Sequence, residues 1–266
     1  MSSKLFTVAI STYGDGVFNL LSAKFNWDKR IEYIVIHQLG GGYASQYEDA
    51  YNHLESSGNI VVIPSDTVGL SISRNLAIFH CKTQWILFSD DDNYYFNKLY
   101  ETIENTIFTY PKYSFFSFKI VSDNGLDFKK YKEHSFEHTL RSILRISSIE
   151  NLFNCDFLKC KKLTFDERFG LGSKYPSCEQ PIFAKGILSS GGKGLYLPIA
   201  ITIHPLENSG DDFYSRANAV ARKKMFKIVY GNFFGHCVFA IFVFGKMKLV
   251  PQENKMDFLR SIFSDK

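Results

Sequence analysis

Three consecutive carboxylates, Asp90, Asp91 and Asp92, directly follow the apolar run WILFS. Like charges side by side repel and resist burial, so such a triplet belongs either in solvent or around a cation. Side chains alternate direction in an extended chain, so Asp90 and Asp92 are expected to face the same side. Two oxygen ligands on a rigid strand end suit Mg²⁺ or Mn²⁺ that also holds a substrate's phosphates. The alternative is a solvated turn or helix N-cap, where Asp is common.

Two further stretches carry candidate groups. In GLSISRN, Arg74 and Asn75 begin a predicted helix, where a guanidinium fork can orient a carboxylate or phosphate, although an isolated Arg is more often exposed there. Glu179 opens another helix after a Gly- and Pro-containing loop and could project into a cleft, but a Glu in the first turn also simply favours the helix dipole. His204, just before Pro205, is a candidate metal ligand, although a lone His is more often packed or hydrogen-bonded.

Strands and helices alternate in the first half of the chain, and this alternation positions those groups. Short apolar runs predict buried strands at residues 5–12, 31–38, 59–65 and 85–89, with helical spacing between them. The pattern predicts an α/β fold with a doubly wound, mostly parallel sheet and flanking helices. Ligands of such sheets lie at the carboxyl ends of the strands, where the acid triplet stands. That position favours the cation over the solvated turn.

The second half is less regular. It predicts a strand at 113–121 and a polar connector at 123–138. Residues 151–205 are predicted to contain a short strand, a Gly-rich loop, a helix at about 178–188 and a strand over GLYLPIAITIH. The net charge of +4 is too mild to indicate a nucleic-acid partner. Five cysteines without a CxxC pair, and an N-terminus without a signal-peptide apolar region, favour a reducing, cytosolic location.

The C-terminal residues 211–266 have a distinct charge pattern. No carboxylate lies between Asp212 and Glu253, and basic residues flank the Phe-rich segment 228–245 on both sides. The basic residues are Arg216, Arg222, Lys223, Lys224, Lys227, Lys246 and Lys248. A core helix does not explain this flanking charge, and a membrane span would need about 20 apolar residues. A helical segment lying in the interface of an anionic membrane is the interpretation that fits best.

Three of these pieces together carry a resemblance to a known family. A first strand ending in Thr12 and Tyr13, the GLSISRN segment and WILFSDDD as a DxD element resemble a family 2 glycosyltransferase of GT-A fold. The later stretch FDERFGLGSKYPSCEQPIF is similar to the family region that carries the catalytic carboxylate. The likeness covers about residues 5–210, and it is closer to bacterial glycosyltransferases of O-antigen or capsule assembly.

The resemblance implies roles for individual residues. Thr12 and Tyr13 would line the nucleotide base pocket, Asp92 would bind the metal, and Asp90 would lie near the metal and the ribose or donor sugar. Glu179 would be the general base, and His204 a third metal ligand. The implied substrate-binding set also includes the residues Asp91, Arg74 and Asn75.

The sequence departs from the family pattern at two places. The second strand usually ends in an Asp that contacts the base, and here Gln38 stands at that position; an amide can still hydrogen-bond uracil. The family often has Glu-Asp where this chain has Glu179-Gln180, and the Asp of that pair is commonly the base. Glu179 therefore inherits the role by default, with Asp166 and Glu167 as rivals.

The resemblance also implies an activity. The protein would be an inverting, Mn²⁺- or Mg²⁺-dependent hexosyltransferase that moves glucose or galactose from a UDP-sugar to a lipid-diphosphate-linked saccharide in O-antigen, lipopolysaccharide or capsule synthesis. It would act at the cytoplasmic face of the membrane. Residues 1–112 would bind the nucleotide-sugar, 113–210 would complete the catalytic domain, and 211–266 would form a helical appendage. The rivals are a nucleotidyltransferase and a catalytically silent membrane-bound scaffold.

Overall fold

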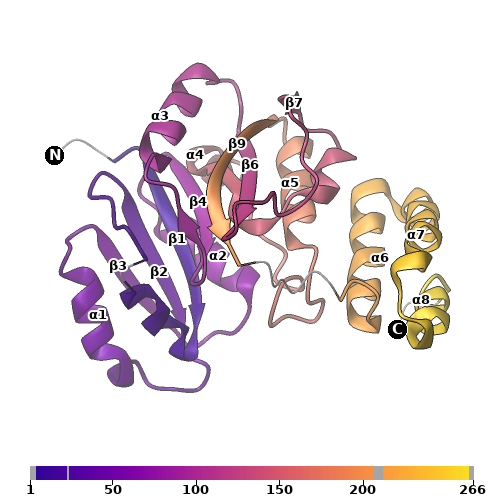
Figure 1. Ribbon diagram of the computed structural model, residues 1–266, viewed down its shortest axis with the longest axis horizontal. Helices are drawn as coiled ribbons and strands as arrows, with labels where there is room; N and C mark the ends of the chain where they lie inside the picture. The colour runs from indigo at the N-terminus through magenta and orange to yellow at the C-terminus, as the bar shows by residue number, and fades with distance from the viewer. Residues whose placement is uncertain (1–3, 23, 206–211, 264–266) are drawn as a thin grey trace.

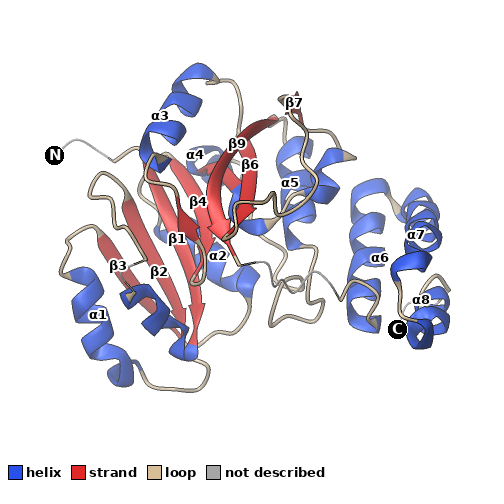
Figure 2. Cartoon of the chain, in the orientation of Figure 1, coloured by secondary structure: helices blue, strands red, loops and turns tan. Residues whose placement is uncertain are grey.

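The computed structural model describes residues 4–22, 24–205 and 212–263. They form a nine-stranded sheet flanked by helices, with a group of C-terminal helices beside it (Figure 1, Figure 2). The strands are β1 (Phe6–Tyr13), β2 (Glu32–Gln38), β3 (Ile60–Ser65), β4 (Trp85–Asp90), β5 (Tyr94–Tyr95), β6 (Phe115–Ser122), β7 (Phe136–Glu137), β8 (Asn151–Asn154) and β9 (Gly194–His204). The helices are α1 (Glu48–Glu55), α2 (Leu70–His80), α3 (Leu99–Thr109), α4 (Cys155–Cys160), α5 (Glu179–Ser189), α6 (Arg216–Tyr230), α7 (Asn232–Lys246) and α8 (Lys255–Arg260).

The strand order across the sheet is β3-β2-β1-β4-β8-β6-β9-β5, and β7 pairs with β9. β1 is parallel to β2 and β4, β2 is parallel to β3, and β6 is parallel to β9. β8 is antiparallel to both β4 and β6, so β6 runs in the same direction as β4. Among the described strands, only the short β5, β7 and β8 run against the others. The predicted doubly wound, mostly parallel α/β sheet is confirmed.

Helices cover both faces of the sheet. Consecutive residues of a strand point to opposite faces, so a single strand can contribute to the core on both sides. In β1, Val8 and Ile10 pack into a cluster that includes residues of α1 and α3. Ala9, between them, packs into a second cluster with residues of α2, α4 and α5. This two-sided burial explains why the parallel strands are continuous apolar runs.

The predicted strands of the first half agree with the structure to within about one residue. The segment after β1, where the sequence shows helical spacing, forms a 3-10 helix over Gly14–Leu21 that buries Val17 and Leu20. The strands β5 and β7 were not predicted, whereas β8 corresponds to the short strand predicted within residues 151–205. The predicted polar connector at 123–138 ends in β7, which pairs with Tyr196 and Leu195 of β9.

One edge of the sheet lies on β3 (Figure 2), and the short β5 ends the other side. Glu55, the last residue of α1, accepts a hydrogen bond from the backbone N–H of Val62 at 2.9 Å. Two residues further along the strand is Pro64, which has no N–H. At this edge the Val62 N–H is therefore bonded within the chain, and Pro64 offers no N–H at all.

The C-terminal helices α6, α7 and α8 have an apolar cluster of their own, with Phe239 and Phe258 at its centre. Gly231 connects α6 to α7, and Gly235 lies so close to α6 that a Cβ there would be 2.5 Å from Lys227 Cα. Lys223 is buried and donates to the carbonyl of Ile262 at 2.8 Å. The expectation that the whole basic set flanks a lipid surface is therefore wrong for Lys223, which fastens the chain after α8 to α6.

Candidate active site

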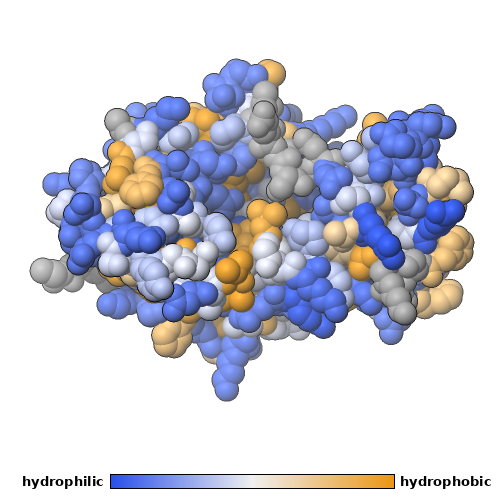
Figure 3. Space-filling model, turned by 90° about the horizontal axis from the view of Figure 1, so that it is seen from below, coloured by the Kyte–Doolittle hydropathy of each residue, from blue (hydrophilic) through white to orange (hydrophobic). Residues whose placement is uncertain are grey.

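A cleft of about 1050 Å³ opens at the carboxyl ends of the parallel strands, where the sequence predicted a ligand site. Figure 3 views the molecule from this side, and the surface is hollowed between the sheet and the C-terminal helices. The ends of β1, β4 and β9, the start of α5 and part of α6 line it. The lining includes the predicted residues Thr12, Tyr13, Gln38, Asp90, Asp91, Asp92, Glu179 and His204.

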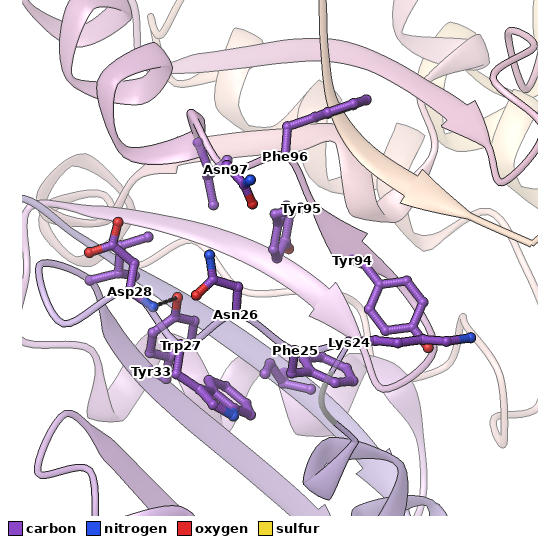
Figure 4. A pocket seen from close by; sticks show the side chains of 13 residues that line it. Lys24, Phe25, Asn26, Trp27, Asp28, Tyr33, Tyr94, Tyr95, Phe96 and Asn97 are labelled. Carbon is purple, nitrogen blue, oxygen red and sulfur yellow. Dashed lines mark hydrogen bonds between the residues drawn. The ribbon is translucent and has the colours of Figure 1, made fainter.

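A second hollow, between residues 24–28 and 94–97, has a volume of only about 30 Å³ (Figure 4). Aromatic side chains fill most of it, with Phe25 and Trp27 stacked at 5.3 Å. That volume suits about one or two water molecules. None of the predicted site residues lines this hollow. The large cleft is therefore the candidate active site.

The three aspartates at the end of β4 face three different partners. Asp92 Oδ1 lies 3.5 Å from His204 Nε2, Asp91 accepts a hydrogen bond from Thr12, and Asp90 Oδ1 lies 3.6 Å from Arg74. The predicted three-ligand set of Asp90, Asp92 and His204 is not assembled: among the described residues no group of three acidic, His or Cys side chains could hold a metal ion. The Asp92–His204 pair is the part of that prediction that the structure brings together.

The donors of this pair fit a divalent cation. A carboxylate and an imidazole are both ligands of Mn²⁺, and Mg²⁺ commonly takes one or two carboxylates together with substrate phosphates. The imidazole is held in place because its Nδ1 lies 2.6 Å from the Pro205 carbonyl and its ring contacts Phe128 edge-on at 5.3 Å. This leaves Nε2 directed toward Asp92. Two protein ligands leave the remaining coordination positions for phosphate oxygens.

Burial, together with nearby charges, shifts the pKa values of the other two aspartates. Burial is the largest cause for Asp90 and raises its pKa, while Arg74 acts in the opposite direction. Burial also raises the pKa of Asp91 to about 6, the Thr12 hydrogen bond lowers it, and the neighbouring carboxylates raise it further. Such crowding of carboxylates at a cleft is typical of a site that receives a cation.

Gly16 makes the contact between Asp91 and Thr12 possible. A Cβ at this position would collide with the Asp91 carboxylate and lie 2.7 Å from Thr12 Oγ1. The glycine belongs to the TYGDG turn, which the sequence marked only as the end of a strand. Its role in the site could not be recognised without knowing that β1 and β4 are neighbours.

Arg74 was predicted to contact substrate, but the structure buries it completely behind the cleft. Its guanidinium lies 3.0 Å from Glu179 Oε1 and 3.6 Å from Asp90 Oδ1, with the rings of Phe88 and Phe165 within 6 Å. The guanidinium offsets the repulsion between the two carboxylates. Arg74 therefore positions acidic residues of the cleft, and the predicted direct contact with substrate is not what its location provides.

Asn75 also differs from the prediction. Its side chain donates to the Phe165 carbonyl at 3.1 Å and accepts from the Phe165 N–H at 2.8 Å, with a further bond to Glu167 at 3.0 Å. It is not among the residues that line the cleft. Asn75 fastens the loop before α5, so its predicted place among the substrate-binding residues is wrong.

The predicted base-pocket residues lie together at the edge of the cleft. Tyr13 is exposed and its ring covers Gly40, where a Cβ would clash with it. The Gln38 amide donates to the Gly69 carbonyl at 3.1 Å and accepts from the Gly69 N–H at 3.3 Å. Gln38 thus holds the turn before α2, and its contact with a nucleotide base stays a prediction.

Glu179 is the first residue of α5 and lines the cleft. The residue before it, Cys178, has a left-handed backbone with φ of 78°, which turns the chain sharply at the helix start. The rival carboxylates point elsewhere: Asp166 pairs with Arg168 at 2.6 Å, and Glu167 is exposed and bonded to Asn75. Neither rival lines the cleft, so the geometry favours Glu179 as the reacting carboxylate.

The cleft lining that was not predicted includes two polar side chains of adjacent helices, Gln180 and Arg222. Gln180 follows Glu179 in α5, and Arg222 reaches the cleft from α6. The sequence showed Gln180 only as a departure from the family pattern and assigned Arg222 to the membrane-facing charges. Only the packing of α6 beside α5 reveals that Arg222 belongs to the cleft.

The parallel strands, the acidic strand end and the carboxylate at the start of α5 together define a GT-A-type transferase. The family model described as glycosyl transferase family 2 matches residues 20–168, more than half of the chain, and the chain belongs to this family. The protein is a glycosyltransferase. The matched range includes Arg74 and the three aspartates, whereas Thr12 and Glu179 lie outside it.

Solved structures show the same fold. TarS residues 1–349 of S. aureus in complex with UDP-GlcNAc has a TM-score of 0.62 and 20% identity, covering 97% of this chain and 81% of that chain. The Pyrobaculum calidifontis mannosyltransferase PcManGT, in complex with GDP-Man and Mn²⁺, has a TM-score of 0.57 and 11% identity, covering 97% and 85%. No curated protein sequence matches the chain.

Proposed function

We propose that the protein transfers a hexose from a UDP-sugar, with inversion, to a saccharide linked to a lipid diphosphate. The observation that carries the proposal is that the Asp92–His204 pair and Glu179 line one cleft, together with Thr12 and Tyr13. The complexes of TarS with UDP and UDP-GlcNAc, and of PcManGT with GDP-Man and Mn²⁺, support a nucleotide-sugar donor.

Asp92 and His204 would hold Mn²⁺ or Mg²⁺, and the ion would supply positive charge to neutralise the leaving diphosphate. Glu179 takes the proton of the acceptor hydroxyl. The acceptor oxygen forms its bond to the anomeric carbon on the face opposite the leaving group, while the bond between that carbon and the UDP oxygen breaks. Arg74 keeps the Glu179 carboxylate fixed at the start of α5.

The test is UDP release from a panel of UDP-glucose, UDP-galactose and UDP-GlcNAc, with GDP-mannose as a different donor. Release of UDP with Mn²⁺, its loss in excess chelator and its recovery with added metal are expected. Asp92→Asn should lose the metal-dependent binding of the donor while the fold persists. Activity in excess chelator would contradict the metal role, and pyrophosphate release from a nucleotide and a sugar phosphate would favour a nucleotidyltransferase.

We also propose that the enzyme binds the inner face of the cell membrane, where a lipid-linked acceptor would be available for bacterial surface polysaccharide synthesis. The support is an apolar stripe on α7 and the turn that follows it, with each side chain at least 63% exposed: Phe233, Phe234, Ile241, Phe244 and Leu249. Orange side chains gather over the C-terminal helices at the right of Figure 3.

The stripe suits an interface better than a membrane span. Within the described residues, Asn232–Leu249 is the segment long and apolar enough to cross a membrane, and only 17% of it is buried. However, Gly235, Phe239 and Val243 on its other side pack against the protein. One face of α7 is thus committed to protein contacts, and the exposed face, with Lys248 near its end, fits an anionic lipid surface.

A further inference from the structure

Gln180 is a buried polar side chain without a partner. It is 2% exposed, it lines the cleft, and within the described residues neither Oε1 nor Nε2 has a hydrogen-bond partner. A buried amide normally pairs both its donor and its acceptor, because leaving them unpaired is unfavourable. An unpaired carboxamide at the wall of an enzyme cleft therefore points to a ligand that pairs with it.

Arg222 provides a second observation on the neighbouring helix. It lines the cleft from α6, its guanidinium lies 5.4 Å from the Phe242 ring centre, and its Nε is buried without a hydrogen-bond partner among the described residues. Arg74, the other guanidinium near the cleft, is already paired with Asp90 and Glu179. Within the described residues Arg222 contacts the Phe242 ring and forms no ion pair with a carboxylate.

The charge of the cleft indicates what Arg222 could bind. Four carboxylates line the cleft: Asp90, Asp91, Asp92 and Glu179. They would repel an anionic ligand unless a positive charge lies next to it. A guanidinium fork matches the oxygens of a phosphate with two parallel hydrogen bonds. A carboxamide can accept a hydrogen bond from one sugar hydroxyl and donate to another.

We propose that Gln180 and Arg222 form the acceptor subsite, and that the acceptor is a saccharide carrying a phosphate. Gln180 binds sugar hydroxyls next to Glu179, and Arg222 binds the phosphate. This inference rests on the proposed transfer reaction and adds the residues that bind the sugar and the phosphate of the acceptor. It also gives α6 a role in the reaction, because a residue beyond the family-matched range completes the site.

The experiment uses the full-length protein with its donor site filled by saturating UDP and Mg²⁺. Binding of glucose 1-phosphate is then followed by ligand-observed NMR, with glucose as the uncharged probe and glucuronate as the carboxylate probe. Glucose 1-phosphate should bind at least tenfold more tightly than either. Arg222→Gln should weaken its binding about tenfold or more, and Arg222→Lys should lose less, since the charge remains but the fork is lost.

Gln180→Leu, of similar volume, should weaken binding of glucose 1-phosphate several-fold without changing the affinity for UDP. The matched control is Lys185→Ala, which removes a charge from α5 outside the cleft and should change neither affinity. The inference fails if Arg222→Gln binds glucose 1-phosphate as the wild type does, or if glucose or glucuronate binds equally well. If UDP itself does not bind, the proposed donor fails instead.

Discussion

Glu179 and Arg74 form the ion pair on which the proposed chemistry depends. Glu179→Gln keeps the size of the side chain but removes the proton acceptor, so turnover should fall by about 10²–10⁴-fold. Affinity for UDP should stay near normal, because the donor is proposed to bind at Asp92 and His204. Turnover is measured as UDP release and affinity by calorimetry.

Asp166→Asn is the matched control for this variant. Asp166 forms a partly exposed pair with Arg168 outside the cleft, and surface pairs contribute about 0–1 kcal/mol to stability. The variant should retain its turnover. If Asp166→Asn lost most of its turnover while Glu179→Gln stayed active, the general base would be a residue of the loop before α5.

His138 predicts how stability depends on pH. It is buried between Ser117 and Ser142, at 2.8 Å and 3.1 Å, and burial lowers its pKa from 6.5 to about 4. The unfolded chain therefore binds a proton below about pH 6.5 that the folded chain does not bind until about pH 4. Stability is lost as the pH falls through this window, by about 2 kcal/mol between pH 7 and pH 5.

Urea unfolding at pH 7 and pH 5 measures this difference. His138→Gln should remove most of it, because the substituted side chain does not titrate. His53→Gln, at an exposed position on α1, should leave the difference unchanged. An undiminished pH dependence in His138→Gln would assign the effect to other groups.

The sequence was a good guide to the residues at strand ends and a poor one to residues on helices. Asp90, Asp92 and His204 follow or end strands, so the rule that parallel strands end together was enough to place them in one cleft. Whether Arg74 and Asn75 reach the cleft depends on which face of α2 points toward it. That direction is set by contacts with Phe165 and Glu179, about 90 and 105 residues further along the chain.

At the level of elements, the parallel strands were predictable because burial on both faces makes them continuous apolar runs. The missed strands β5 and β7 have two residues each, too few for a two-residue alternation to be recognised. β8 inserts between β4 and β6, and this pairing depends on long-range packing alone. The reversal of direction within the sheet was therefore beyond the reach of sequence patterns.

The α6–α7 pair predicts opposite effects for two glycines of one helix. A Cβ at Gly235 would lie 2.5 Å from both Lys227 Cα and the Phe226 carbonyl oxygen, whereas nothing lies within 4 Å of a Cβ at Gly245. Gly235→Ala should destabilise the protein by about 1–3 kcal/mol through overpacking. Gly245→Ala should stabilise it by up to about 1 kcal/mol, because alanine is the better helix former.

Thermal unfolding of both variants checks this pair of predictions, with UDP affinity as a second measurement. The donor site lies at the strand ends and should bind UDP normally in the folded Gly235→Ala protein. Equal stability of the two variants would mean that α6 and α7 do not pack as closely as the structure shows.

For the molecule as a whole, the apolar stripe predicts how the enzyme binds membranes. The wild type should sediment with anionic vesicles at low salt and be released at high salt. Ile241→Ser with Phe244→Ser removes two exposed side chains that the fold does not need, and should weaken binding by roughly 2 kcal/mol, about 30-fold.

The control is Phe79→Ser with Phe108→Ser, which removes equally exposed rings from α2 and α3. It should sediment with the vesicles as the wild type does. If the wild type ignores anionic vesicles and instead forms a dimer that the stripe variant loses, the stripe is a contact between two copies and the membrane proposal fails.

The arrangement at β3 has a consequence for solubility. A growing aggregate adds strands to a sheet edge that presents free N–H groups, but at Val62 that group is bonded to Glu55, and at Pro64 there is none. A second chain would find few donors there with which to begin a shared sheet. The apolar stripe on α7 already gives the enzyme one surface at which molecules could associate. With two donors removed, the β3 edge is a poor second surface for joining molecules into chains.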